Sequence, residues 1–491
     1  MSSRMSSRTG ASARRLVVVN WRDRTHPEAG GAEVVCEELA HRLAASGWEV
    51  TYLTSRGPGQ ARTDLRGAVR YVRLGGRLGV YPLVLGWLFL RRRRIDAVLD
   101  SQNGIPFFSP LAVRRSAAVV LLLHHVHQDQ FAMHFPPAAA RMGRVLEGPV
   151  SRIVYRDRTV VAVSASTRQQ ARQLLQLHGP ILVAPPGSHP VQVPPVRAPS
   201  PRIVCVGRLV AHKRLELVIR CLPELLRRWP DLELHIVGDG AARPGLEAET
   251  LRLGLGSSVT FHGMVDEDTK VRLVATGWVG ATASAFEGWC LSVIEANAAG
   301  LPMVGLHRPG VRDSIRDGET GWLARSEEEL AATLSRAIET LSDPDTAASF
   351  SEAVRSWASR FTWGEMATRV EACLVFEHTR RSLGRTDRRH VGDVSTVVHV
   401  AAQLSGGLLR DRLRPLDRIR EHTDGSVTVL LVGADTEGAR TALDRVLPGW
   451  HDSQVRISVA QQADLVDLTS PAEPLAPFGP VGPPRSALSP A

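Results

Sequence analysis

The sequence predicts two α/β domains, each built on a parallel sheet, followed by a smaller α/β unit. Short apolar runs alternate with helical stretches along most of the chain. Continuous apolar strands separated by helices are typical of parallel sheets covered on both faces. The length of 491 residues exceeds what one hydrophobic core supports, since domains usually hold about 100–200 residues. A proline-rich segment divides the alternation into two halves.

The first half contains the apolar runs that we assign to the strands of the first domain. They lie at 15–20, 48–54, 69–74, 96–100, 117–124, 159–164 and 181–184. We therefore expect a Rossmann-like domain at 15–190 and a linker at 191–201, where prolines favour a stiff, extended chain. Segment 1–14 is basic and lacks the apolar core of a signal peptide, so we expect a disordered tail there.

The second half repeats the alternation at once. Apolar runs lie at 202–207, 232–238, 258–263, 278–284 and 301–306. A helical run at 364–381 is expected to close this domain, which we place at 202–381. At 394–468 a strand, a basic helix and a strand–helix pair suggest a small appended unit of β-α-β type. The proline-rich segment 469–491 predicts a disordered tail.

The charge of the chain is strongly biased toward arginine. Of 60 basic residues, against 50 acidic ones, only Lys213 and Lys270 are lysines. GC-rich coding produces such a bias without selection for phosphate binding, so we expect no nucleic-acid partner. An anionic membrane surface is the favoured use of the net charge of +10.

The longest apolar stretch, at 78–90, is too short for the ~20 residues that span a bilayer. Arg91 to Arg94 follow it directly, so it suits either an anionic interface or a domain helix with a solvated basic end. The five cysteines show neither C-x-x-C nor zinc spacing, which fits a reducing compartment. We expect a cytoplasmic protein, with peripheral binding to the inner face of the plasma membrane as an option.

Two glutamates, Glu287 and Glu295, give the strongest chemical signal. The first follows a predicted strand, and the second lies one turn inside the helix that comes next. Backbone N–H groups at the start of that helix form an anion site; they belong to Gly288, Trp289, Cys290 and Leu291. Glu295 can accept hydrogen bonds from a ribose diol, and Glu287 can contact a second hydroxylated group. The alternative is a capped surface helix with two solvated acids.

A basic pair and a glycine-rich loop support the same reading. Arg208 ends the first strand of the second domain and Lys213 begins the next helix, so together they can neutralise a diphosphate without a metal. The alternative is a surface basic pair. Gly30 and Gly31 lie between the first strand and first helix, where glycine lets the backbone approach a bound group.

Other candidate residues offer no metal site. His124, His125 and His127 cluster at the end of the fifth apolar run, but no cysteine or aspartate spacing accompanies them. Asp266 and Asp268 spell D-x-D, yet they follow a strand and begin a helix, so N-capping explains them better.

The segment S-x-x-E-G-x-x-L-S-V-I-E-A, from Ser284 to Ala296, resembles the E-x7-E motif of the retaining glycosyltransferases of family 4. The G-R-x-x-x-x-K pattern ending at Lys213 and the G-G-A-E loop are similar to that family too, and the resemblance covers about residues 15–380. It implies the GT-B fold: two Rossmann-like doubly wound domains facing a cleft, here with the small C-terminal α/β appendage. Cys290 departs from the family, which often has glycine there, and would add bulk beside the anion site.

The resemblance implies transfer of a sugar, with retention, from a nucleotide diphosphate sugar to an acceptor on the first domain. It implies catalytic roles for His124 (His127 in the alternative register), Glu287, Arg208 and Lys213. Binding of the donor would further use Gly30, Gly31, Gly288, Trp289, Cys290, Leu291 and Glu295. No cofactor or metal is implied, and the expected acceptor is a carbohydrate or a lipid-linked cell-envelope glycan. A non-catalytic sugar- or nucleotide-binding protein and a sugar phosphorylase remain the alternatives.

Overall fold

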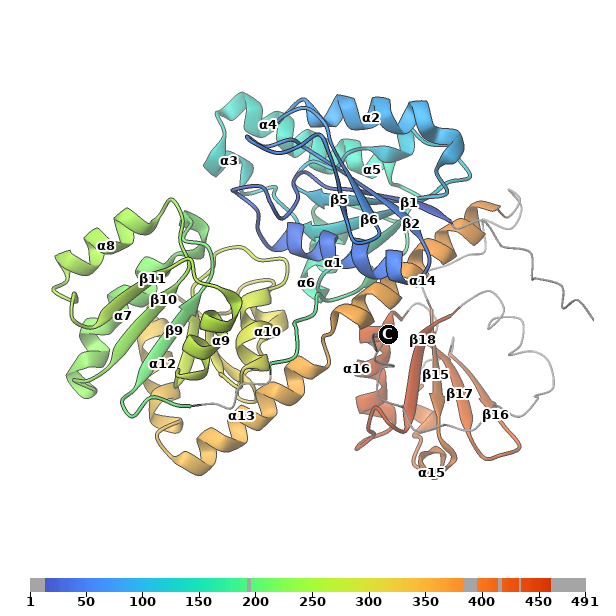
Figure 1. Ribbon diagram of the computed structural model, residues 1–491. Helices are drawn as coiled ribbons and strands as arrows, with labels where there is room; N and C mark the ends of the chain where they lie inside the picture. The colour runs from blue at the N-terminus through green and yellow to red at the C-terminus, as the bar shows by residue number, and fades with distance from the viewer. Residues whose placement is uncertain (1–13, 192–195, 383–394, 414–416, 432–433, 461–491) are drawn as a thin grey trace, which may run out of the picture.

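A computed structural model of the chain describes residues 14–191, 196–382, 395–413, 417–431 and 434–460. Its strands form three separate sheets (Figure 1), and we refer to the first, second and third unit accordingly. The expected pair of α/β units is confirmed, with the GT-B arrangement of two Rossmann-like sheets. The tail predicted at 1–14 lies outside the described residues except for Arg14, and the tail predicted at 469–491 lies wholly outside them.

The first unit has an eight-stranded sheet in the order β3-β4-β2-β1-β5-β6-β7-β8. All neighbours are parallel except β3 and β4. The strands are β1 Arg15–Val19, β2 Glu49–Thr54, β3 Thr63–Arg66, β4 Val69–Arg73, β5 Ala97–Asn103, β6 Ala118–His125, β7 Thr159–Ala162 and β8 Ile181–Val183. The edge strand β3 was not expected, because its sequence TDLR carries no apolar run.

Helices cover both faces of this sheet. They are α1 Gly31–Ala45, α2 Val80–Arg91, α3 Phe131–His134, α4 Pro137–Val145, α5 Ser151–Val154 and α6 Ala165–Gln173, with short turns at Arg92–Arg94, Ser109–Leu111 and Leu146–Val150. The apolar side chains form one core cluster on each face, and strand β6 is buried along its whole length. No helix among the described residues has both the length and the apolarity needed to cross a bilayer.

The second unit has a six-stranded parallel sheet in the order β11-β10-β9-β12-β13-β14. Its strands are β9 Arg202–Val206, β10 Glu233–Val237, β11 Val259–Gly263, β12 Val279–Thr282, β13 Met303–Leu306 and β14 Gly321–Ala324. Its helices are α7 Leu215–Arg228, α8 Arg243–Arg252, α9 Glu267–Ala275, α10 Leu291–Ala298, α11 Val311–Ser314 and α12 Glu329–Thr340, after a short turn at Ala211–Lys213. The strand order reverses between β9 and β12, and ligands bind at such a switch point, outside the carboxyl ends of the strands.

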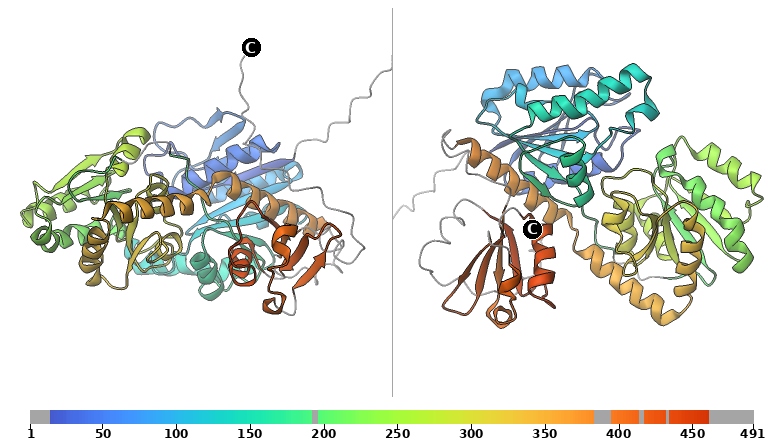
Figure 2. Two further views of the ribbon diagram at one scale, coloured as in Figure 1. Left: turned by 90° about the horizontal axis from the view of Figure 1, so that it is seen from below. Right: turned by 180° about the vertical axis from the view of Figure 1, so that it is seen from behind.

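Two long helices, α13 Pro344–Ser359 and α14 Trp363–Ser382, lead back to the first unit (Figures 1 and 2). Helix α14 contacts β6, β7 and α1, and Met366, Val370 and Leu374 lie in the core cluster of the first sheet. The expectation that 364–381 closes the second domain is therefore wrong on this point. The apolar stripe predicted that this helix is buried, but a stripe does not say against which sheet.

The chain crosses between the two units twice, and the two crossings touch. The first runs from β8 to β9, and the second joins α13 to α14. Ser188 N–H donates to Phe361 O (3.1 Å), and Ser188 pairs with Thr362 in an isolated parallel bridge. Gly187 fits only because it has no side chain, since a Cβ there would lie 2.3 Å from the Thr362 carbonyl carbon.

The third unit is a four-stranded sheet in the order β16-β17-β15-β18. Its elements are β15 Thr396–Val400, α15 Ala402–Ser405, β16 Arg418–Glu421, β17 Val427–Leu431, α16 Thr436–Val446 and β18 Val455–Val459, with a short turn at Arg410–Arg412. Neighbouring strands pair antiparallel, and the expected basic helix is wrong, because short turns and the strand β16 occupy its described residues. The β-α-β expectation holds for β17, α16 and β18: both strands run antiparallel to β15, which lies between them, so they are parallel to each other. Asp435, the N-cap of α16, ion-pairs with Arg168 on α6.

Candidate functional site

The loop from β12 to α10 carries Glu287 into the space between the two units. Lys213, at the end of the short turn after β9, forms an ion pair with the Glu287 carboxylate. The two side chains are only 20% and 15% exposed. Burial alone would lower the pKa of Lys213, but the Glu287 charge outweighs it and holds that pKa above its ordinary value. The structure thus joins two predicted site residues in one charged pair.

Arg208 reaches from the second unit to the glycine-rich loop of the first. Its guanidinium donates to the Glu28 carbonyl (3.3 Å), and a Cβ at Gly30 would lie 2.6 Å from Arg208 Nη2. A Cβ at Gly31 would lie 3.4 Å from a methyl of Leu291, at the start of α10. The absence of a side chain at Gly30 therefore gives the guanidinium its place between the units.

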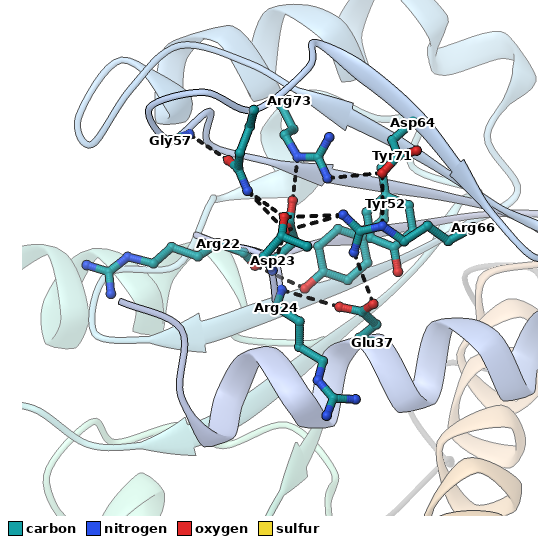
Figure 3. Close-up of polar contacts among 12 residues, drawn as sticks. Arg22, Asp23, Arg24, Glu37, Tyr52, Gly57, Asp64, Arg66, Tyr71 and Arg73 are labelled. Atoms are coloured by element: carbon teal, nitrogen blue, oxygen red, sulfur yellow. Dashed lines mark hydrogen bonds and ion pairs between the residues drawn. The ribbon is translucent and has the colours of Figure 1, made fainter. Parts of the chain in front are cut away.

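A buried polar network holds the chain just before this loop (Figure 3). Asp23 accepts hydrogen bonds from Arg73 Nε (2.6 Å) and from the Thr25 backbone (2.9 Å). Burial would raise the pKa of Asp23, but these bonds outweigh it and keep the pKa below its ordinary value. Tyr52 donates its hydroxyl to the Arg22 carbonyl (3.1 Å). No local pattern in the sequence indicates this network, since the residues named here come from three separate segments, at 22–25, 52 and 73.

The residues after Glu287 form the contact between the units. A Cβ at Gly288 would lie 1.6 Å from the His124 carbonyl oxygen, and Thr167 donates its hydroxyl to the Gly288 carbonyl (3.2 Å). Trp289 packs into the core cluster of the first unit, with its ring 5.0 Å from that of Phe361. Gly288 and Trp289 therefore close the gap between the units at this point.

The start of α10 differs from expectation in two ways. The Leu291 N–H donates to Trp289 O (3.0 Å), so that predicted anion donor is already engaged. The Cys290 side chain, which was expected to add bulk beside the anion site, is buried in an apolar core cluster of the second unit. Burial, reinforced by the Glu287 charge, raises the pKa of its thiol to about 11.

The three histidines point in different directions. His124 turns toward α1, with Nε2 3.0 Å from Ser101 Oγ and 3.6 Å from Cys36 Sγ. Burial, aided by the His127 charge, lowers its pKa to about 3. His125 instead faces the second unit, its ring 6.3 Å from that of Phe286. The geometry thus favours His125 over the predicted His124 as the side chain nearest the Glu287 loop, since neighbours on a strand point to opposite faces.

His127, the other predicted candidate, lies farther from α10. Its Nδ1 is 3.7 Å from Glu147 Oε1, and its backbone N–H donates to the same oxygen (2.6 Å). Glu147 is fully buried, so it fixes the segment that follows β6. The structure therefore gives His127 a partner within the first unit.

Glu295 lies in α10, behind the charged pair. Its Oε2 accepts a hydrogen bond from Lys270 Nζ (3.0 Å). Lys270 was not among the predicted site residues. Both residues line a cavity of about 410 Å³. The signal in the sequence that could have found Lys270 is the rarity of lysine in this chain.

Asp266 caps α9, as predicted, by accepting a hydrogen bond from the Thr269 N–H (2.8 Å). Within the part of the chain that the structure describes, no three His, Cys, Asp or Glu side chains are grouped so as to hold a metal ion.

Fold and site together define a GT-B protein of the glycosyltransferase class. The family described as "Glycosyltransferase Family 4" matches residues 29–192, and "Glycosyl transferases group 1" matches residues 192–357. The chain belongs to family 4 of the GT-B glycosyltransferases.

Several known proteins are similar to this chain. A D-inositol 3-phosphate glycosyltransferase of Nocardia farcinica is 30% identical over 39% of this chain and 49% of the relative. A GDP-mannose-dependent phosphatidylinositol monomannoside mannosyltransferase of Mycolicibacterium smegmatis is 32% identical over 35% and 47%. These alignments span about half the length of either relative. A D-inositol 3-phosphate glycosyltransferase of Streptomyces griseus is 27% identical over 72% and 87%.

Solved structures share the fold. Sucrose-phosphate synthase of Thermosynechococcus elongatus has a TM-score of 0.62 at 19% identity, over 75% of this chain and all of that one. A glycosyltransferase of Rickettsia africae has a TM-score of 0.59 at 18% identity, over 74% and 98%.

Proposed function

We propose that this protein transfers a sugar from a nucleotide diphosphate sugar to an acceptor, with retention at the anomeric carbon. The observation that carries the proposal is the Lys213–Glu287 pair beside the start of α10, with Arg208 opposite the Gly30 loop. A diphosphate leaving group develops negative charge, and positioned cations stabilise that charge in the transition state.

Each residue of this site then has its own role in the reaction. Lys213 and Arg208 hold the diphosphate, together with the N–H groups of the residues just before α10. Glu287 orients the sugar, and Glu295 accepts hydrogen bonds from the ribose. The departing phosphate takes the acceptor proton on the same face of the sugar, so no protein nucleophile is needed. His124 or His125, at the end of β6, lies on the acceptor side, and no metal enters the reaction.

The acceptor that we propose is a lipid-linked or cell-envelope glycan, met at the cytoplasmic face of the plasma membrane. Leu83, Phe89 and Leu90 on α2 are all at least half exposed. The basic segment Arg91–Arg94 follows them, with the Arg92 guanidinium over the Phe89 ring at 4.1 Å. An apolar face with a basic end suits an anionic interface.

Release of nucleoside diphosphate from a panel of nucleotide sugars, with and without lipid acceptors, tests the proposal. We expect release with one donor, faster with a lipid acceptor and unchanged by EDTA, and the product should keep the donor's anomeric configuration in NMR spectra. Binding without release would instead indicate a non-catalytic protein. Turnover that needs free phosphate and ignores nucleotide would indicate a phosphorylase.

A further inference from the structure

The second unit contains another lysine–glutamate pair, Lys270 and Glu295, and its lysine has no role in the reaction described above. Lys270 lies on α9, and its ammonium contacts Glu295 Oε2 (3.0 Å) and Glu267 Oε1 (2.7 Å). The Lys270 side chain is only 19% exposed. Burial would lower its pKa, but the charges of Glu295 and Glu267 outweigh that effect and raise it. The ammonium is therefore charged and held at the wall of the 410 Å³ cavity.

The two lysines of this chain occupy matching positions. All the other Lys or Arg positions of the chain are arginine. Lys213 pairs with Glu287, and Lys270 pairs with Glu295. An ammonium is a compact charge with three donors, whereas a guanidinium is planar and larger. A lysine beside each glutamate of the E-x7-E segment thus leaves room for a ligand. This coincidence of residue type and position favours a binding role over that of an ordinary surface ion pair.

The cavity beside Glu295 is lined by both polar and apolar residues. Lys270, Glu295 and Ser292 offer donors and acceptors, while Val206 and Val274 line it with apolar surface. A nucleoside has the complementary character, with apolar base faces, a polar base edge and a ribose diol. Since Glu287 precedes α10 and Glu295 lies within it, a ligand held by both would place its diphosphate near Lys213 and its nucleoside near Lys270.

We propose that Lys270 binds the nucleoside half of the donor, as Lys213 binds the diphosphate half. Two N–H bonds of the ammonium are directed at Glu267 and Glu295, and the third donates to an acceptor oxygen of the nucleoside. Lys270 also fixes Glu295 through Oε2, so that Oε1 accepts from the ribose. This inference rests on the proposed function, because it presupposes a nucleotide donor.

Calorimetry on the full chain tests the inference. The probes are the 5′-monophosphates and diphosphates of uridine, guanosine, adenosine, cytidine and thymidine, together with inorganic pyrophosphate. We expect Lys270→Met to weaken the best-bound monophosphate and its diphosphate by the same factor, about tenfold or more, as for a lost charged hydrogen bond. Pyrophosphate binding should not change. Lys213→Met should weaken the diphosphate and pyrophosphate instead.

Arg220→Met is the matched control, because it removes a cation that pairs with Glu249 (2.6 Å) on α8, outside the cavity. It should leave every affinity unchanged. Lys270→Gln gives a second variant if Lys270→Met does not fold. The double variant with Glu295→Gln should lose less than the sum of the single losses, as for two groups acting on one ligand.

Three results would overturn the inference. If folded Lys270→Met and Lys270→Gln bound the nucleotides with wild-type affinity, Lys270 and Glu295 would be an ordinary surface ion pair. If Lys270→Met weakened pyrophosphate binding by the same factor, Lys270 would act only through its general electrostatic effect on anions. If the wild-type chain bound none of the nucleotides, the proposed function would fail first, whereas weakening by Glu295→Gln but not by Lys270→Met would reject this inference alone.

Discussion

The Lys213 ammonium has one strong partner in the cleft, the Glu287 carboxylate. A diphosphate entering beside α10 would compete with that carboxylate for the ammonium. It would succeed because it brings more negative charge and several acceptor oxygens. The pair is therefore a preformed cation site whose partner keeps it charged and in place.

We expect Lys213→Ala to lower kcat/KM by about 2–4 kcal/mol of transition-state stabilisation, as for removal of one positioned charge contact. Steady-state kinetics with the donor found in the panel measures this, with Arg220→Met as the control for loss of a cation. A kcat/KM equal to that of the wild type would remove Lys213 from the site.

Gly288 offers a second test at the same scale. Because a Cβ there would lie 1.6 Å from the His124 carbonyl oxygen, Gly288→Ala should push the loop away from the first unit. We expect kcat/KM to fall about tenfold or more, with faster hydrogen exchange at β6. Gly245→Ala on α8, where a Cβ meets nothing within 4 Å, should behave as wild type. Unchanged hydrogen exchange and kinetics in Gly288→Ala would show that the contact between Gly288 and His124 can adjust without loss of function.

At the scale of single residues, the sequence predicted which positions gather, but not always which side chain points where. Glu287, Arg208, Lys213 and the Gly30 loop meet because they follow strands whose carboxyl ends face each other. His125 could not be preferred over His124, since the choice depends on a register shift between β5 and β6 beside these histidines. Such an irregularity leaves no trace in a run of apolar residues.

Among the elements, α2 carries the prediction about membranes. If its exposed apolar side chains and Arg91–Arg94 meet an anionic surface, binding to liposomes should rise with anionic lipid and fall with salt. Each arginine contributes about 1 kcal/mol near such a surface. Cosedimentation should therefore show weaker binding when the four arginines are changed to glutamine.

The control for this experiment changes Arg227 and Arg228, exposed on α7 of the second unit, to glutamine. This variant should sediment with liposomes as the wild type does. If the wild-type chain stays in the supernatant with anionic liposomes at low salt, the basic segment is a solvated helix end, and a soluble acceptor becomes the better proposal.

Element type was easier to predict than element pairing. The short apolar runs that form β1, β6 and β9 were predictable as strands, because strands of a parallel sheet that is buried on both faces carry such continuous apolar sequence. The third unit was misjudged because β16, with the sequence RIRE, resembles a basic helix as much as an edge strand. Its antiparallel pairing follows from contacts distant in sequence, which no local pattern reveals.

For the whole molecule, a buried charge on α14 fixes this helix to the first unit. Glu377 is fully buried and accepts hydrogen bonds from Thr159 (2.9 Å), Arg158 (3.2 Å) and Arg381 (2.8 Å). Removing one member of a buried ionic cluster leaves the others uncompensated, at a cost of about 3–5 kcal/mol.

We therefore expect Glu377→Ala to reduce the free energy of unfolding of the first unit by that amount, measured by urea denaturation. The control is Glu319→Ala, which breaks an exposed pair with Arg316 (3.1 Å) and should cost at most about 1 kcal/mol. Equal midpoints for the two variants would mean that α14 adds nothing to the first unit beyond its apolar contacts.

The two crossings between the units, which touch at Ser188 and Thr362, act together as a hinge with a single pin. Two crossing segments that contact each other at one point permit one unit to rotate about that point, but they resist sliding of one unit past the other. Opening the cleft would thus swing Arg208 and Lys213 along one arc, so they would return to the same place on closure. Cutting either crossing alone would leave the units attached but would remove this restraint on sliding.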